Sequence, residues 1–243
     1  MNPTQSVPPL VLCIPGPWPD HDALVRAIME SGDAYLFAGQ ILMHMESGFS
    51  CTVSQHHADQ RMPQAFAAAG YRWRDTPAMQ AINTHQTVVY LEGQGGSRAH
   101  AEAMMLAASC LLKAGGLGVK VESSGIAHAP ATWLDFTEHL QLYSAHEALV
   151  AYVGDEDSCF SCGMHNLGLY DAIIARSDSD TPAQVLKTFT RYLFIDTPTI
   201  LDQQTFRLAT DAPHYRVQRV DGTPYQGDSL FNNPYGAWRL TAA

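Results

Sequence analysis

Charged residues are scarce in this sequence. Asp, Glu, Lys and Arg together make up 16% of its 243 residues, against the roughly 25% that is usual for soluble domains. Uncharged polar side chains and eleven histidines must supply much of the surface polarity, so we expect a crowded or partner-covered surface. Positive charge is the scarcest, since fourteen Lys and Arg face twenty-four Asp and Glu, for a net charge of −10. An acidic chain repels phosphate backbones, and we expect no general nucleic-acid binding.

Long apolar runs are also missing. No stretch of the sequence approaches the roughly twenty consecutive apolar residues of a membrane-spanning helix. Residues 1–9 contain no Lys or Arg, so we expect no secretory signal. The five cysteines form an odd set that does not fit the paired disulfide framework of a small secreted protein. The sequence therefore predicts a soluble protein of a reducing cytoplasm.

The sequence does contain enough apolar material for a large core. Hydrophobic residues account for 46% and aromatic residues for 9% of the chain. A chain of this length can bury about two thirds of its extended surface. Strand-like and helix-like segments are mixed without strict alternation, and no repeat or Ser-rich or Pro-rich linker divides them. We predict a single compact α+β domain over residues 1–243, with a mixed sheet packed by several amphipathic helices. A C-terminal portion from about residue 178 is expected to be weakly separable.

Two segments have the clearest helical pattern. Ser97 can cap a helix with one apolar stripe up to Leu112, which Gly115-Gly116 would end. Asp180-Thr181-Pro182 begins a second amphipathic helix. The first helix lies between strand-like segments, an order that favours a right-handed crossover if the two strands are parallel neighbours. Shorter helices are expected after Pro19, over residues 59–69 and after Thr76, and a turn at Asp221-Gly222. Strands are expected over Leu10–Ile14, Tyr35–Met45, Ser50–Gln55, Thr87–Leu91, Val119–Val121, Glu147–Val153 and Gly168–Ala175.

A glycine-rich segment precedes the first of these helices. Gly93-Gln94-Gly95-Gly96-Ser97 follows a strand and opens a helix, where phosphate-binding loops are placed. A dinucleotide fingerprint needs a third glycine where Arg98 stands, and a Walker loop needs a Gly-Lys pair that the segment lacks. We therefore expect a flexible turn with a serine cap.

One group of residues has ligands suited to zinc. Cys159, Cys162 and His165 have the spacing C-x-x-C-x-x-H, and thiolate and imidazole groups bind zinc in tetrahedral geometry. A structural zinc site needs a fourth ligand, which folding would have to bring from elsewhere. The candidates for this fourth ligand are His128, His139, His146 and Asp157. Zinc is thus a candidate cofactor, and two ordinary thiols beside a turn are the alternative.

A second group follows the strand-like segment Val119–Val121. Two serines, Gly125 and His128 come just after the strand, and Trp133 follows five residues later. Loops at strand ends often carry binding residues, so we predict ligand or partner contacts by Ser124, Gly125, His128 and Trp133. Ser124 and His128 also suit a nucleophile and its base, but the Gly-x-Ser-x-Gly pattern is absent and no Asp partner can be assigned.

Two segments resemble a bacterial family that is known only as a domain of unknown function. They are Val119–Trp133, with the sequence VKVESSGIAHAPATW, and Cys162–Asp171, with the sequence CGMHNLGLYD. Leu12–Trp18 and Ala34–Leu42 fit the same pattern, so the resemblance spans most of the chain. In the family an acidic residue more often follows glycine and one apolar residue directly, whereas Tyr170 intervenes here. The resemblance implies a soluble bacterial α+β protein and supplies no mechanism.

The acidic charge favours a function in binding. We expect a non-catalytic binding protein, of the kind in which an immunity protein neutralises a toxic and basic protein partner, because negative charge attracts such a partner. The alternative is a hydrolase, either serine-type through Ser124 and His128 or metal-assisted through Cys159, Cys162 and His165. A structural or regulatory subunit that self-associates through apolar surface is a third hypothesis.

Overall fold

The computed structural model describes residues 7–220 and 230–243. These residues form helices and strands in which the strands are divided between two sheets. The α+β class is confirmed. The turn expected at Asp221-Gly222 lies outside the described residues. Within the described part of the chain, no helix is both long and apolar enough to cross a membrane.

The first sheet is antiparallel throughout and is centred on a buried strand. Its order is β2-β3-β4-β5-β1-β6-β7. Residues 12–16 of β1 are all buried. The strands are β1 (Pro9–Gly16), β2 (Tyr35–Ala38), β3 (Ile41–His44), β4 (Ser50–His57), β5 (Thr87–Gln94), β6 (Val119–Val121) and β7 (Ile126–His128).

The segment Tyr35–Met45 is a hairpin, and the prediction of one strand was wrong. Strands β2 and β3 pair antiparallel, with Ala38 opposite Ile41. Gly39 has a φ of 62°, which glycine adopts without strain and which a tight hairpin turn requires. The residues on both sides of this glycine are apolar, so the sequence pattern did not indicate a turn.

The predicted unit of strand, helix and strand is present, but its strands are not neighbours. Helix α4 (Arg98–Lys113) follows β5 and precedes β6. The Ser97 side chain accepts a hydrogen bond from the His100 amide, as its role as a cap predicts. Strand β1 lies between β5 and β6 and is antiparallel to both, so β5 and β6 run in the same direction without pairing.

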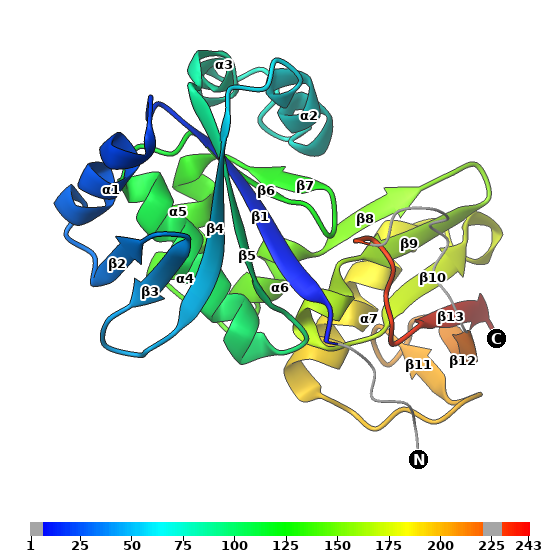
Figure 1. The fold of residues 1–243 in the computed structure, drawn as a ribbon. Helices are drawn as coiled ribbons and strands as arrows, with labels where there is room; N and C mark the ends of the chain where they lie inside the picture. Colours follow the sequence, from blue (N-terminus) through cyan, green and yellow to red (C-terminus); the bar gives the residue numbers. More distant parts are fainter. Residues whose placement is uncertain (1–6, 221–229) are drawn as a thin grey trace.

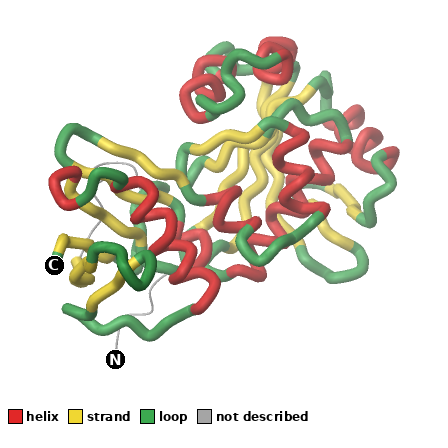
Figure 2. The backbone as a smooth tube through the Cα atoms, turned by 180° about the vertical axis from the view of Figure 1, so that it is seen from behind, coloured by secondary structure: helices red, strands yellow, loops and turns green. Residues whose placement is uncertain are grey.

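Helices pack on both faces of the first sheet. Alternate residues of a strand point to opposite faces, and accordingly Leu12 and Ile14 belong to the large core whereas Cys13 belongs to a smaller core with Phe66 and Trp73. Figures 1 and 2 show most helices on one face, and α2 and α3 at one end of the sheet. The helices of this part are α1 (His21–Glu30), α2 (Met62–Ala69), α3 (Pro77–Ala81), α4, α5 (Pro130–Glu138) and α6 (Ser144–Leu149).

The second sheet is mixed. Its order is β11-β12-β13-β10-β9-β8, in which β10 and β13 are parallel and all other neighbours antiparallel. Helix α7 (Pro182–Asp196) begins at the predicted Pro182 and packs against β9 and β10. The strands are β8 (Ala151–Gly154), β9 (Ser158–Cys162), β10 (Asp171–Ala175), β11 (Thr205–Arg207), β12 (His214–Val220) and β13 (Ala237–Ala242).

Two predicted strands of this sheet were too long at their N-terminal ends. The strand expected over Glu147–Val153 begins only at Ala151, because α6 continues to Leu149. The strand expected from Gly168 begins at Asp171, because a short 3-10 helix, η2 (Met164–Leu167), precedes it. The weakly separable portion from about residue 178 stays a prediction, while β10 and β13, on either side of that position, pair within one sheet.

Candidate functional site

The two segments that carry the family resemblance contact each other. The Ser123 hydroxyl, in the turn between β6 and β7, donates a hydrogen bond of 2.8 Å to Oδ1 of Asn166 in η2, and both residues are fully buried. The Cys162 thiol donates to the Ser123 carbonyl oxygen at 3.7 Å. This contact joins the first sheet to the second.

Glycines make the close approach of the two segments possible. Gly163 has a φ of 113°, and a Cβ atom at this position would lie 2.8 Å from Cβ of Ser124 and still closer to the backbone of Leu149. On its other side, η2 contacts the glycine-rich segment, where the Gly96 amide donates to the Asn166 carbonyl oxygen at 3.0 Å. That segment, expected as a flexible turn, thus packs against η2.

A buried carboxylate holds the chain that follows η2. Oδ1 of Asp171 accepts a hydrogen bond from the Ser161 hydroxyl at 2.8 Å, and Oδ2 accepts one from the Asn233 side chain at 2.7 Å. Nδ1 of His165 lies 4.0 Å from Oδ2 of the same carboxylate. Asp171 and His165 are both buried, so this cluster positions the backbone and is closed to a substrate.

The structure does not bring the three predicted zinc ligands to one point. Cys159 lies opposite Gly154 and Ile174 in the second sheet, whereas the Cys162 thiol contacts the Ser123 carbonyl and His165 lies beside Asp171. Residues three apart on a strand also point to opposite faces. Among the residues that the structure describes, no group of three or more His, Cys, Asp or Glu side chains is arranged to hold a metal.

The candidate fourth ligands are equally dispersed. His146 Nε2 lies 3.0 Å from the Thr190 hydroxyl. His128 Nε2 donates a hydrogen bond of 2.9 Å to the Ala148 carbonyl oxygen. His139 and Asp157 are exposed. Since a carbonyl oxygen can only accept, His128 carries its proton on Nε2 in this contact.

Ser124 and His128 are not arranged as a nucleophile and its base. The Ser124 hydroxyl is buried and has no hydrogen-bond partner among the described atoms. The His128 imidazole donates to the Ala148 carbonyl, and burial lowers the pKa of His128 to about 4. A general base must reach the proton that it removes, and this histidine does not contact the serine hydroxyl.

Trp133 is a core residue. Its indole is completely buried and donates a hydrogen bond of 3.1 Å to the Met105 carbonyl oxygen in α4. The ring also packs against His128, with 5.7 Å between the ring centroids. Trp133 therefore supports the loop from inside and has no surface for a partner.

Ser124 and Gly125, by contrast, line a cleft between the two sheets, which we call the junction cleft. Its volume is about 470 Å³, within the range of ligand sites. The β6–β7 turn, the end of α2, α6, β8 and α7 all contribute to its walls. The polar side chains in these walls are those of Tyr71, Arg72, Ser124, His146, Glu147, Tyr152, Gln184 and Lys187.

One wall of the junction cleft contains a neutral hydrogen-bonded network. The Tyr152 hydroxyl lies 2.7 Å from the Thr190 hydroxyl and 3.2 Å from Nε2 of His146. Burial lowers the pKa of His146 to about 4 and raises the pKa of Tyr152. Both groups are therefore uncharged at neutral pH. They can offer hydrogen bonds but no charge to a bound group.

The second wall contains an ion-pair network. The Glu147 carboxylate accepts hydrogen bonds from Lys187 at 3.2 Å and from Arg191. Burial alone would raise the pKa of Glu147, but the hydrogen bonds from the two cations outweigh it and the pKa is lowered. No motif in the sequence pointed to these residues. The spacing of Lys187 and Arg191 places them on one face of α7, but nothing in the sequence identifies Glu147 as their partner.

A comparison of the chain with protein families, with curated proteins and with solved structures found no match. The resemblance to a family of unknown function therefore stays a prediction.

The contact at Gly163 is expected to be essential for stability. Gly163→Ala introduces both an unfavourable φ and a clash with the Leu149 backbone, and should lower the free energy of unfolding by at least about 3 kcal/mol. Gly39→Ala is the matched control, because Gly39 also has a positive φ but open space around it. It should cost about 1 kcal/mol. Urea unfolding measures both, and equal costs would show that the close approach is unimportant.

The buried histidines predict a loss of stability in mild acid. His128 and His146 have folded pKa values of about 4, below the ordinary value of 6.5, so the unfolded chain binds more protons between these values. The free energy of unfolding should therefore fall as the pH decreases from about 7 to about 5. His128→Gln should reduce this fall in urea titrations, whereas His57→Gln, at an exposed histidine, should leave it unchanged. An unaltered pH dependence in His128→Gln would contradict the assignment.

Proposed function

We propose that this protein is a non-catalytic binding protein that recognises a basic protein partner, in the manner of an immunity-type protein. The contact surface would be strand β8 with the turn that follows it. The observation that carries the proposal is the position of this strand, since an open sheet edge, an acidic turn and the junction cleft adjoin one another there.

Strand β8 is the last strand of the second sheet. Among the described residues it pairs only with β9, which leaves its other edge open. Tyr152 and Val153 line both the junction cleft and a second cleft of about 570 Å³, to which Arg176 and Asp180 also contribute. An extended segment of a partner can add to an open edge through backbone hydrogen bonds while its side chains occupy adjacent pockets.

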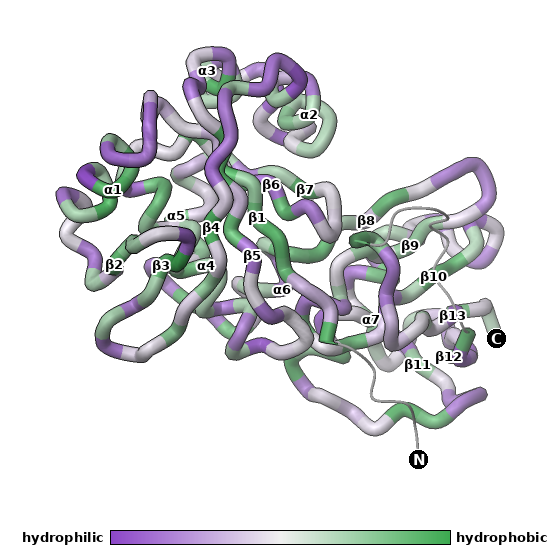
Figure 3. Tube along the Cα trace, in the orientation of Figure 1, coloured by the Kyte–Doolittle hydropathy of each residue, from purple (hydrophilic) through white to green (hydrophobic). Residues whose placement is uncertain are grey.

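The turn after β8 concentrates negative charge. It consists of Asp155, Glu156 and Asp157, all exposed, and we call it the acidic turn. Oδ1 of Asp155 accepts hydrogen bonds from the amides of Asp157 and Ser158, which orders the turn. None of the ion pairs found among the described residues involves these three carboxylates. Figure 3 shows the tip of the β8–β9 hairpin as strongly hydrophilic.

This charge suits recognition of a basic partner. The Arg176 guanidinium donates to the Asp155 carbonyl oxygen at 2.7 Å and offsets part of the negative charge of the turn. The remaining negative charge attracts positive charge over about 8–10 Å at physiological ionic strength, and the net charge of −10 acts in the same direction. Electrostatic attraction of this kind raises association rates and selects partners of opposite charge. The alternative of a hydrolase has less support, because Ser124 does not contact His128 and the Cys159, Cys162 and His165 side chains are dispersed.

The acidic turn can be tested by removing its charge. The triple variant Asp155→Asn, Glu156→Gln, Asp157→Asn keeps an oxygen at each position, including the one that orders the turn. The candidate partners are the product of the adjacent gene and basic proteins captured from cell lysate. Binding of each purified candidate is measured by calorimetry at low and high salt. The Kd should rise about tenfold at low salt, with a smaller salt dependence.

The matched control removes the same charge elsewhere. Asp22→Asn, Glu30→Gln and Glu46→Gln neutralise three exposed carboxylates on or near α1 and β3, and together should change the Kd less than about twofold. If both triple variants change the Kd equally, the overall charge of the protein and not the acidic turn determines binding. If no basic protein binds at micromolar concentration, the proposed function is wrong.

A further inference from the structure

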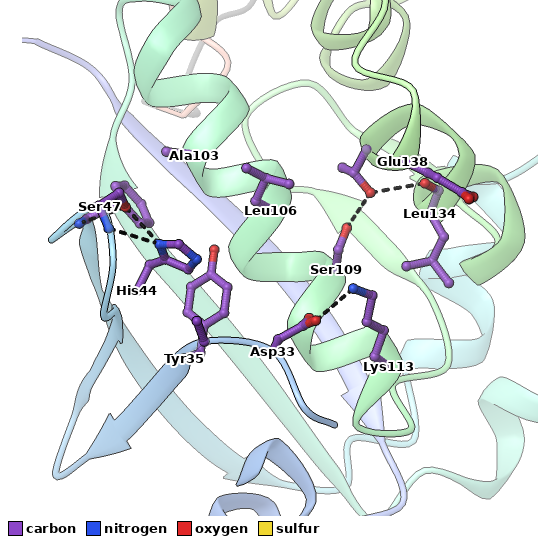
Figure 4. Close-up of a pocket in the computed structure, with 13 residues that line it drawn as sticks. Asp33, Tyr35, His44, Ser47, Ala103, Leu106, Ser109, Lys113, Leu134 and Glu138 are labelled. Atoms are coloured by element: carbon purple, nitrogen blue, oxygen red, sulfur yellow. Dashed lines mark hydrogen bonds and ion pairs between the residues drawn. The ribbon is translucent and has the colours of Figure 1, made fainter. Parts of the chain in front are cut away.

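A further cavity lies on the other side of the molecule from strand β8, between the β2–β3 hairpin and helices α4 and α5. We call it the hairpin cavity (Figure 4). Its volume is about 580 Å³, within the range of about 300–1,000 Å³ that is typical of small-molecule sites. No motif in the sequence points to it, and it shares no residue with the junction cleft.

Apolar side chains form much of the cavity wall. Phe49, Ala103, Leu106 and Leu134 line it. Leu106 is 39% exposed, although the other large apolar side chains of α4 are buried. An apolar side chain left open within a concave surface is stabilised when an apolar group covers it.

The hairpin supplies a hydrogen-bond donor at one side of the cavity. The Ser47 amide donates to Nδ1 of His44 at 3.2 Å, and the Ser47 hydroxyl lies 2.9 Å from the same nitrogen. Because a backbone amide can only donate, Nδ1 is the acceptor and the ring proton is on Nε2. This Nε2–H has no partner among the described residues and lies on the side of Tyr35 (Figure 4).

Tyr35 supplies a second polar group. Its ring packs edge-on against His44, with 4.8 Å between the ring centroids. Figure 4 shows its hydroxyl pointing into the space between His44 and Leu106. The hydroxyl makes no hydrogen bond with another described residue, and burial raises the pKa of Tyr35, so the group stays protonated and can donate.

The charges around the cavity disfavour an ionic ligand. Lys113 is paired with Asp33 at 2.8 Å, which neutralises the cation. Glu138 adds a negative charge at the rim. The remaining polar pair, Ser109 and Thr137, is satisfied internally at 2.8 Å.

We propose that the hairpin cavity is a binding site for an uncharged aromatic molecule that carries a carbonyl oxygen. The aromatic ring packs against Leu106 and Leu134, and the carbonyl oxygen accepts hydrogen bonds from Tyr35 Oη and His44 Nε2. The site is separate from strand β8, so its occupation does not depend on the proposed protein partner.

The test uses two uncharged probes of the same size, acetophenone and indole, and one anion, benzoate. Chemical-shift titration of the full chain should give a Kd of about 1 mM for acetophenone. Indole has an aromatic ring but lacks the carbonyl oxygen that would accept both hydrogen bonds, and it should bind at least about fivefold more weakly. Benzoate should bind more weakly than acetophenone, because Glu138 repels it and the cation of the cavity, Lys113, is already paired with Asp33.

Variants then locate the binding. Tyr35→Phe should weaken acetophenone about fivefold and leave indole unchanged. Leu106→Gln should weaken both probes, whereas Leu140→Gln, at a leucine that is likewise 39% exposed but lies outside the cavity, should weaken neither. Tyr35→Phe removes one atom and keeps the test valid if Leu106→Gln unfolds. The absence of saturable acetophenone binding up to about 10 mM, or an equal effect of Tyr35→Phe on both probes, would overturn the proposal.

Discussion

The close contact between η2 and the turn that joins β6 to β7 is the constraint on which the rest of the structure depends. It is the place where the two sheets meet, through the Ser123–Asn166 hydrogen bond and the Cys162 thiol. Only a residue without a side chain fits at Gly163. The junction cleft exists because this contact fixes the Ser124–Gly125 turn opposite β8 and α7.

Some of the buried polar groups around this contact are satisfied by the protein itself, and this affects how the histidines and serines are interpreted. Asp171 accepts hydrogen bonds from Ser161 and Asn233, and His128 donates to a backbone carbonyl. Buried polar groups that are satisfied in this way specify one arrangement of the chain. Residues of the kind found in catalytic sites can therefore serve packing alone, and their arrangement decides between the two roles.

Sequence patterns predicted the elements whose signals are local. The apolar stripe and the Ser97 cap identified α4, and Pro182 identified the start of α7. The β2–β3 hairpin was missed because Gly39 interrupts a run that is apolar on both sides. In the junction cleft, Ser124 and Gly125 are predicted as contact residues because they follow a strand, and this role stays a prediction. Tyr152, Thr190 and Glu147 come from separate elements that only folding brings together. The spacing of Cys159 and Cys162 suggested that they bind one zinc ion, but strand geometry places the two side chains on opposite faces.

The position of β13 has a consequence for the order in which the chain can assemble. This strand follows every other described strand in sequence, yet it lies in the interior of the second sheet between β12 and β10. During synthesis on the ribosome, the strands of the first sheet emerge early and can pair with one another. The second sheet cannot be completed until residues 237–242 leave the exit tunnel, because β13 joins β11 and β12 to β10, β9 and β8. Until then the unpaired strand edges can pair incorrectly.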